Sequence, residues 1–111
     1  MITHGFVEIE QHVAGVELAD LEPLTILLVS TWHSVYRIVV VGGNEVLVQG
    51  GPFFSELTGA RLDGVSAGGH ALKVGWIAVG HPMALRISGQ VILTSPVVAV
   101  ATERPCVPVV H

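Results

Sequence analysis

The sequence predicts an all-β fold: a small antiparallel β-barrel or sandwich of about six to seven strands with one short N-terminal helix. Two observations support this prediction. After Pro23 the chain consists of apolar runs of about five to nine residues, and glycine-rich turns separate these runs. A chain of 111 residues has the length of one ordinary domain. We therefore expect a single β domain, with an acidic segment at residues 1–23, a β-barrel core at 24–101 and a Pro-containing tail at 102–111.

The first predicted element is the helix, at residues 12–21. Apolar side chains recur there at near-helical spacing, at Val13 and Val16 and then at Ala19 and Leu21. A proline follows the segment, as is common just beyond a helix C-terminus. The helix is expected to be short, and Gly15 interrupts it.

Seven strands are predicted after the helix, and their turns favour antiparallel pairing. Residues 42–44 (GGN) and 88–90 (SGQ) lie between apolar runs and suit tight hairpins, because Gly and Asn readily adopt positive φ. Pro96 cannot donate to a ladder, so its segment is expected at an edge, a bulge or a change of sheet. The predicted strands span residues 24–31, 35–41, 45–49, 60–65, 72–79, 84–88 and 91–100.

Several of these strands are apolar on both faces. In residues 35–41 (VYRIVVV), Ile38 lies on one face with Tyr36, and Val39 lies on the other with Val41. Only 13% of the residues are charged, against about 25% in a typical domain. One face of an antiparallel sheet is usually exposed to water, so a second apolar face must be covered. We therefore expect a homo-oligomer that associates through its apolar β-strands.

Composition disfavours other partners. The net charge is −4, and the five Lys and Arg residues are scattered, so nucleic-acid binding is not expected. The apolar runs are far shorter than the ~18–20 residues of a spanning helix, so no membrane span is expected. The first residues do not resemble a secretory signal, which favours a cytoplasmic location. Cys106 is the only cysteine, which excludes an intrachain disulfide.

One short motif suggests catalysis. Residues 64–68 (GVSAG) fit the pattern G-x-S-x-G, in which Ser66 would be a nucleophile on a turn between a strand and a helix. The residues that follow favour a strand, and a triad would need Glu103 and His111 from the Pro-rich end of the chain. Gly64 and Gly69 have phosphate-loop spacing but lack the Lys and Ser or Thr that should follow. We therefore expect no catalytic residue here and interpret the segment as a sharp β corner.

The six histidines show no short paired spacing that would organise a metal site. No metal or other cofactor is therefore predicted. The alternative function is a small hydrolase that uses Ser66, or a metal held by His33 or His70 with Asp63 and Glu56.

A ligand site is predicted at one end of the barrel. Trp32 and His33 occupy the turn between the first two predicted strands, and barrel ends are common places for ligand sites. If the glycine corner meets this turn, Trp32 supplies contact area, the histidines supply polar groups, and backbone N–H groups accept a small molecule or anion. The predicted site comprises Trp32, His33, Ser66, Gly68, Gly69 and His70.

A second aromatic cluster, Phe53 and Phe54, lies in another turn-rich segment. Either aromatic cluster is expected to plug the core or to form an interface, and less readily to line a ligand pocket. The function predicted from the sequence is therefore a non-enzymatic, self-assembling binding or interaction module.

Overall fold

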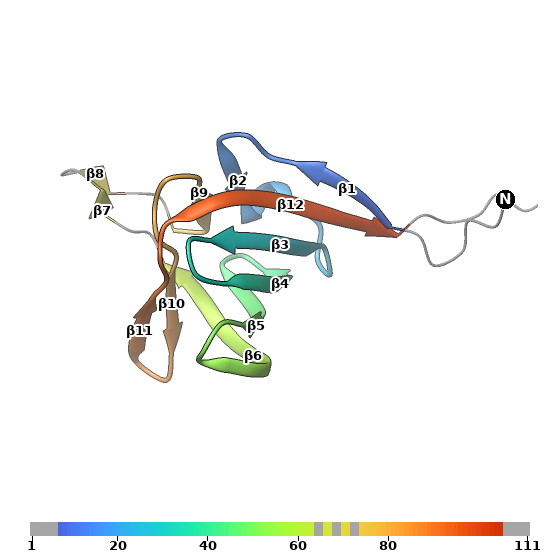
Figure 1. Ribbon diagram of the computed structural model, residues 1–111. Helices are drawn as coiled ribbons and strands as arrows, with labels where there is room; N and C mark the ends of the chain where they lie inside the picture. Colours follow the sequence, from blue (N-terminus) through green and yellow to red (C-terminus); the bar gives the residue numbers. More distant parts are fainter. Residues whose placement is uncertain (1–6, 64–65, 68–69, 72–73, 106–111) are drawn as a thin grey trace, which may run out of the picture.

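The chain folds almost entirely into β-strands. The computed structural model describes residues 7–63, 66–67, 70–71 and 74–105 (Figure 1). The strands are β1 (Val7–Gln11), β2 (Gly15–Glu17), β3 (Ile26–Thr31), β4 (Val35–Gly42), β5 (Glu45–Gly50), β6 (Phe54–Asp63), β7 (Ser66–Ala67), β8 (His70–Ala71), β9 (Trp76–Ala78), β10 (Ala84–Ile87), β11 (Gln90–Leu93) and β12 (Val97–Pro105). The all-β prediction is confirmed.

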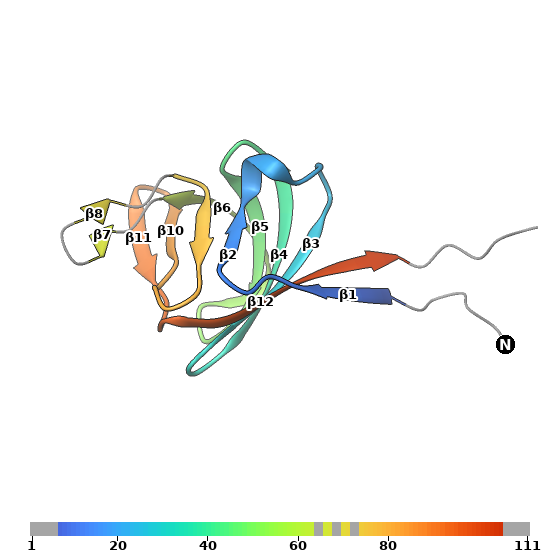
Figure 2. The same ribbon diagram turned by 90° about the horizontal axis from the view of Figure 1, so that it is seen from above.

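Eight of the strands form one antiparallel sheet in the order β1-β12-β3-β4-β5-β6-β10-β11. This sheet curls into a half-barrel, which Figures 1 and 2 show from two directions. Two small sheets pair β2 with β9 and β7 with β8. Within the described parts of the chain, β1 and β11 are the edges of the large sheet, so the curl stays open.

The predicted N-terminal helix is wrong. Residues 15–17 form β2, in which Val16 pairs with Ile77 of β9, and only a single 3-10 turn follows at Leu18–Asp20. Val16 and Leu18 are buried whereas Val13 is 92% exposed, so burial here follows a period of two. Gly15 has φ +127, a conformation that favours extended pairing over a helix.

Several strand boundaries also differ from the predicted ones. β6 begins at Phe54, well before residue 60, because the glycine-rich segment before it forms a tight turn and no long loop. The predicted strand at 91–100 divides at Pro96 into β11 and β12. Pro96 thus lies in the connection between two strands of the same sheet, where no ladder hydrogen bond from its nitrogen is needed. β12 continues to Pro105, so residues 102–105 of the expected tail pair with β1.

The core lies between the inner face of the curled sheet and the β2–β9 sheet. In Figure 2, β2 and β9 lie between the β10–β11 hairpin and strands β3–β5. Burial alternates along β3, β4 and β5, as expected for strands with one face on a core. The buried cluster is mostly aliphatic and comprises Val16, Leu18, Leu27, Val29, Tyr36, Ile38, Val40, Val46, Val48, Phe54, Ala60, Leu62, Ile77, Met83, Leu85, Val97 and Val100.

Leu24 carries local backbone strain that can be relieved. Its φ is +71, its N–H donates to the Val40 carbonyl at 2.7 Å, and its side chain is 76% exposed. A left-handed conformation costs a non-glycine residue about 1–2 kcal/mol. We expect Leu24→Gly to raise the free energy of unfolding by about 0.5–1 kcal/mol, measured by urea denaturation, because little packing is lost.

The matched control for this substitution is Leu57→Gly. Leu57 is another exposed leucine, but it lies within β6. Glycine there should lower the free energy of unfolding by about 1 kcal/mol, because it gives the unfolded chain more freedom and Leu57 has no positive φ to relieve. If Leu24→Gly lowers the free energy of unfolding as much as Leu57→Gly does, Leu24 is not strained.

Candidate interaction surface at one end of the sheet

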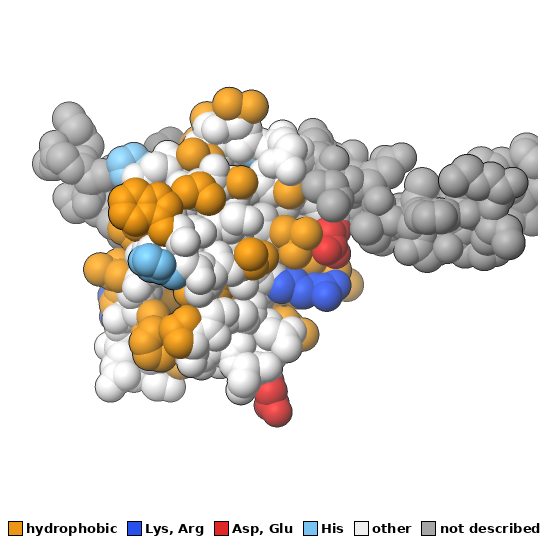
Figure 3. All heavy atoms as spheres, in the orientation of Figure 1, with side chains coloured by type: hydrophobic (Ala, Val, Ile, Leu, Met, Phe, Trp, Pro, Cys, Tyr) orange, Lys and Arg blue, Asp and Glu red, His pale blue; other side chains and the backbone are white. Residues whose placement is uncertain are grey.

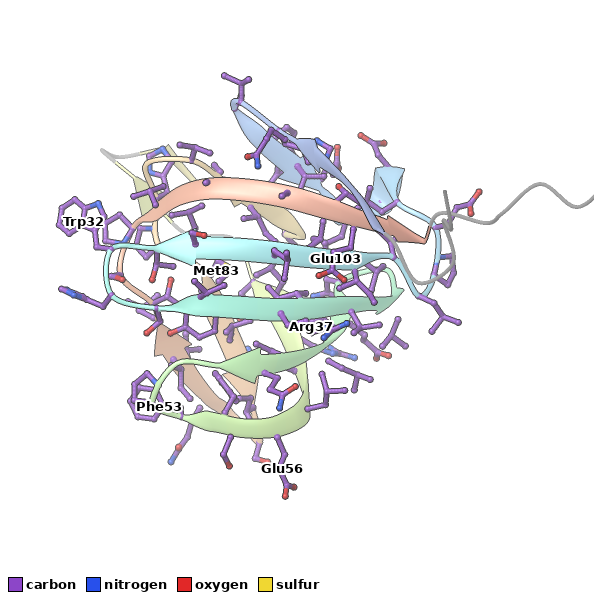
Figure 4. The ribbon with its side chains drawn as sticks, turned by 45° about the vertical axis from the view of Figure 1, so that its right-hand side comes forward. Trp32, Arg37, Phe53, Glu56, Met83 and Glu103 are labelled. Atoms are coloured by element: carbon purple, nitrogen blue, oxygen red, sulfur yellow. The ribbon has the colours of Figure 1, made fainter. Side chains whose placement is uncertain are left out.

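Two hairpin turns lie at the same end of the large sheet. Residues 32–34 connect β3 to β4, and residues 51–53 connect β5 to β6. Tyr36, near the start of β4, pairs with Gly50 at the end of β5, and Gly50 also pairs with Phe54. This register places the two turns side by side, and Figure 4 shows Trp32 and Phe53 projecting from the same side of the molecule.

The side chains at this end are apolar and exposed. Trp32 is 68% exposed and Phe53 is 66% exposed, and Val35 and Val98 are exposed beside the same turns. Val98 belongs here because its neighbour Val97 pairs with Thr31, directly before Trp32. We call Trp32, Val35, Phe53 and Val98 the aromatic end.

Figure 3 shows hydrophobic and histidine side chains gathered over one part of this face of the molecule. The acidic and basic side chains that stand out in the same view lie away from them. The four residues of the aromatic end carry no charge. No charged side chain of the aromatic end therefore offsets the cost of exposing its apolar surface to water.

Hydrogen bonds fix the turn that presents Trp32. The Thr31 hydroxyl donates to the Ser34 carbonyl at 3.1 Å and accepts from the Ser34 N–H at 3.1 Å. The Thr31 N–H also donates to the Ser34 carbonyl, at 2.8 Å. The His33 N–H donates to the Ser95 hydroxyl at 3.3 Å, which ties the turn to the segment before β12. Trp32 therefore projects from a backbone that is already ordered, so little backbone entropy remains to be lost on binding.

The second turn divides its two phenylalanines. Phe54 is buried with Tyr36, whereas Phe53 points away from the core. Phe54 thus plugs the core, which is one of the two roles predicted for this pair. Phe53 does not, and an exposed ring at a turn is typical of an interface.

The outer face of the sheet is also partly apolar, as the sequence predicted. Ile26 of β3 pairs with Val39 of β4, and Val39 pairs in turn with Leu47 of β5, so the three form a half-buried row. An ion pair between Arg37 and Glu103, at 3.5 Å, lies on the same face (Figure 4). The row is less exposed than the aromatic end, which makes the aromatic end the stronger candidate for association.

The residues of the predicted ligand site fall into two groups. Trp32 belongs to the aromatic end, and His33 is exposed next to it in the chain. Ser66 and His70 lie in β7 and β8, where Ser66 pairs with Ala71 and Ala67 pairs with His70. Figures 1 and 2 draw the β7–β8 hairpin apart from the β3–β4 turn. Two further residues of the prediction, Gly68 and Gly69, lie outside the described residues, so a joint ligand site stays a prediction.

The chain around Ser66 is a short β-hairpin in its described part. β7 and β8 pair antiparallel, whereas a nucleophile elbow is a turn between a strand and a helix. The glycines of the predicted β corner, Gly64, Gly68 and Gly69, lie outside the described residues. His111, the base that a triad would need, lies outside the described residues. The hydrolase alternative stays a prediction.

The described residues contain neither a metal site nor a membrane-spanning helix. Within residues 7–63, 66–67, 70–71 and 74–105, no group of three or more His, Cys, Asp or Glu side chains could hold a metal ion. No helix in that same portion is long and apolar enough to cross a membrane. Comparisons of the chain with models of protein families, with curated proteins and with solved structures find no match.

Proposed function

We propose that the protein is a non-enzymatic, cytoplasmic interaction module that assembles with itself through the aromatic end. The observation that carries the proposal is the exposure of Trp32 and Phe53 on turns at the same end of the sheet. Aromatic side chains are enriched at interface centres, where Trp in particular contributes a large share of binding energy. Leaving two such rings in water is costly unless a partner covers them.

The aromatic rings can form the centre of the interface in a small symmetric dimer. A buried aromatic side chain contributes about 150–250 Å², so the exposed parts of four rings from two copies amount to roughly 400–650 Å². Val35, Val98 and the surrounding backbone add to this area. Stable interfaces begin at about 1,200 Å² in total. The aromatic end therefore forms the centre of the interface, and the residues around it supply the rest of the buried area.

A second copy of the chain is the occupant that the composition favours. A two-fold dimer uses the same patch on both partners, so Trp32 of one copy can pack on Phe53 of the other and the reverse contact repeats it. The aromatic end carries no charge, so self-contact brings no like charges together. Only 13% of all residues are charged, so the surface has few charged groups that would oppose association of one copy with another.

We expect Trp32→Ser and Phe53→Ser each to raise the dimer Kd by about tenfold or more, because each removes a central aromatic contact. Analytical ultracentrifugation over a concentration series measures this change. Val13→Ser is the matched control, because Val13 is 92% exposed but lies in the β1–β2 connection. That variant should keep the Kd of the unmodified protein.

Two results would contradict the proposal. The first is an unmodified protein that sediments as an 11.7 kDa monomer at all micromolar concentrations. The second is an oligomer whose Kd is the same in Trp32→Ser, in Phe53→Ser and in Val13→Ser. Circular dichroism confirms that each variant is folded, so a lost oligomer cannot be attributed to unfolding.

A further inference from the structure

A groove of about 550 Å³ crosses the outer face of β5, β6 and β10. Its apolar lining includes Val41, Leu47 and Ile87, and its charged lining comprises Arg61, Arg86 and Glu45. Small-molecule sites usually enclose about 300–1,000 Å³ and combine an apolar lining with a few polar groups. The groove is open to solvent, combines apolar and charged side chains, and shares no residue with the aromatic end.

The two arginines of the groove are direct cross-strand neighbours. Arg61 of β6 pairs with Arg86 of β10. Like charges directly opposite each other on adjacent strands destabilise a sheet. The chain as a whole is acidic, with a net charge of −4, yet it places these two cations side by side. Glu45 and Asp63 offset part of this repulsion, and an anion bound between the two guanidinium groups would offset more of it.

Each of these arginines contacts one carboxylate within the chain. Arg86 Nε donates to Asp63 at 2.7 Å, which holds this guanidinium in place. An Arg61 terminal nitrogen lies 3.5 Å from Glu45, and both side chains of this pair are more than half exposed. An exposed pair at this distance is weak. Each contact uses one guanidinium nitrogen, and a guanidinium has five N–H donors.

We propose that the groove binds the carboxylate of a small aliphatic organic acid. The carboxylate bridges the guanidinium groups of Arg61 and Arg86, for which their planar N–H donors are well suited. The hydrocarbon chain of the acid packs on Leu47, Val41 and Ile87. In this arrangement the ligand displaces Glu45 from Arg61, while Asp63 continues to position Arg86.

Hexanoate is the probe, and binding is followed by the backbone amide shifts of the groove residues in a two-dimensional NMR titration. A ligand of this size is expected to bind at about millimolar concentration. Hexanol, which has the chain without the charge, and inorganic phosphate, which has charge without the chain, should each bind about tenfold more weakly than hexanoate.

Substitutions in the groove should change hexanoate affinity in opposite directions. Arg61→Gln and Arg86→Gln should each weaken binding about tenfold, because each removes a charged donor. Glu45→Gln should tighten it by roughly two- to fivefold, because the competing carboxylate is gone. The control is Arg37→Gln, since Arg37 has an ion pair of its own at 3.5 Å but does not line the groove. Its affinity should be unchanged.

Saturable hexanoate binding that follows this pattern supports the site. The proposal is overturned if the shifts do not saturate, if hexanol binds as well as hexanoate, or if Arg37→Gln weakens binding as much as the groove variants. It is also overturned if phosphate matches hexanoate, because the apolar lining would then have no role. The titration is repeated on Phe53→Ser, where unchanged binding separates this site from the self-association surface.

Discussion

Replacing Gly50 by alanine is expected to lower the free energy of unfolding by more than about 3 kcal/mol. Gly50 has φ +125, which an L side chain rarely adopts. A Cβ built there would lie 2.2 Å from the Val35 carbonyl oxygen and 3.1 Å from the Tyr36 Cα. Both are backbone atoms of β4, so they can move only if the end of the β4–β5 ladder separates.

Gly59→Ala is the matched control for Gly50→Ala. Gly59 lies within β6, and a Cβ there would meet nothing within 4 Å. Alanine at this position should leave stability unchanged or raise it by up to about 1 kcal/mol, because the unfolded chain loses freedom. Urea denaturation followed by tryptophan fluorescence measures both variants. If Gly50→Ala unfolds at the same urea concentration as Gly59→Ala, the close contact at Gly50 does not exist.

Ile38→Ala should lower the free energy of unfolding by about 3–4 kcal/mol, because it leaves a cavity in the centre of the core. Ile38 is fully buried in β4, and its cross-strand partners Leu27 and Val48 are fully buried as well. Neighbours fixed in strands on both sides cannot collapse easily into the space. Urea denaturation should show a lower midpoint with little change in slope.

The next residue along β4 provides the control. Val39 lies on the outer face and is only half buried. Val39→Ala should therefore cost about 1 kcal/mol or less. Equal losses from Ile38→Ala and Val39→Ala would contradict the register, because a slip by one residue exchanges the two faces of a strand.

Local features of this fold were predictable from the sequence. The turns at residues 42–44 and 88–90 were predicted from residues that tolerate positive φ, and Gly43, Ser88 and Gly89 all have positive φ. The alternation along β4 likewise identified Ile38 as facing away from Val39. Both features depend on a few neighbouring residues, for which propensity and spacing are informative.

The long-range pairings were not predictable in the same way. β2 pairs with β9, and the apolar spacing that suggested a helix there was too short to separate a period of two from one of 3.6. Trp32 was placed correctly at a turn, but its proximity to Phe53 depends on the order of β3, β4, β5 and β6. The pairing of Arg61 with Arg86 depends on β10 lying next to β6 in the sheet, although β7, β8 and β9 lie between these two strands in the sequence.

The pairing of β1 with β12 has a consequence for how the protein folds. Gln11 pairs with Ala101, and the His12 ring is hydrogen-bonded to the Thr102 hydroxyl across 90 positions of the chain. Contacts this distant in sequence slow folding, because the entropy of closing the loop is lost before the contacts form. β12 also lies between β1 and β3, so during synthesis the edge of β3 that pairs with β12 keeps its backbone N–H and C=O groups unpaired until residues 97–105 have left the ribosome. Capture of the nascent chain by chaperones should therefore centre on β3 and cease once β12 has emerged.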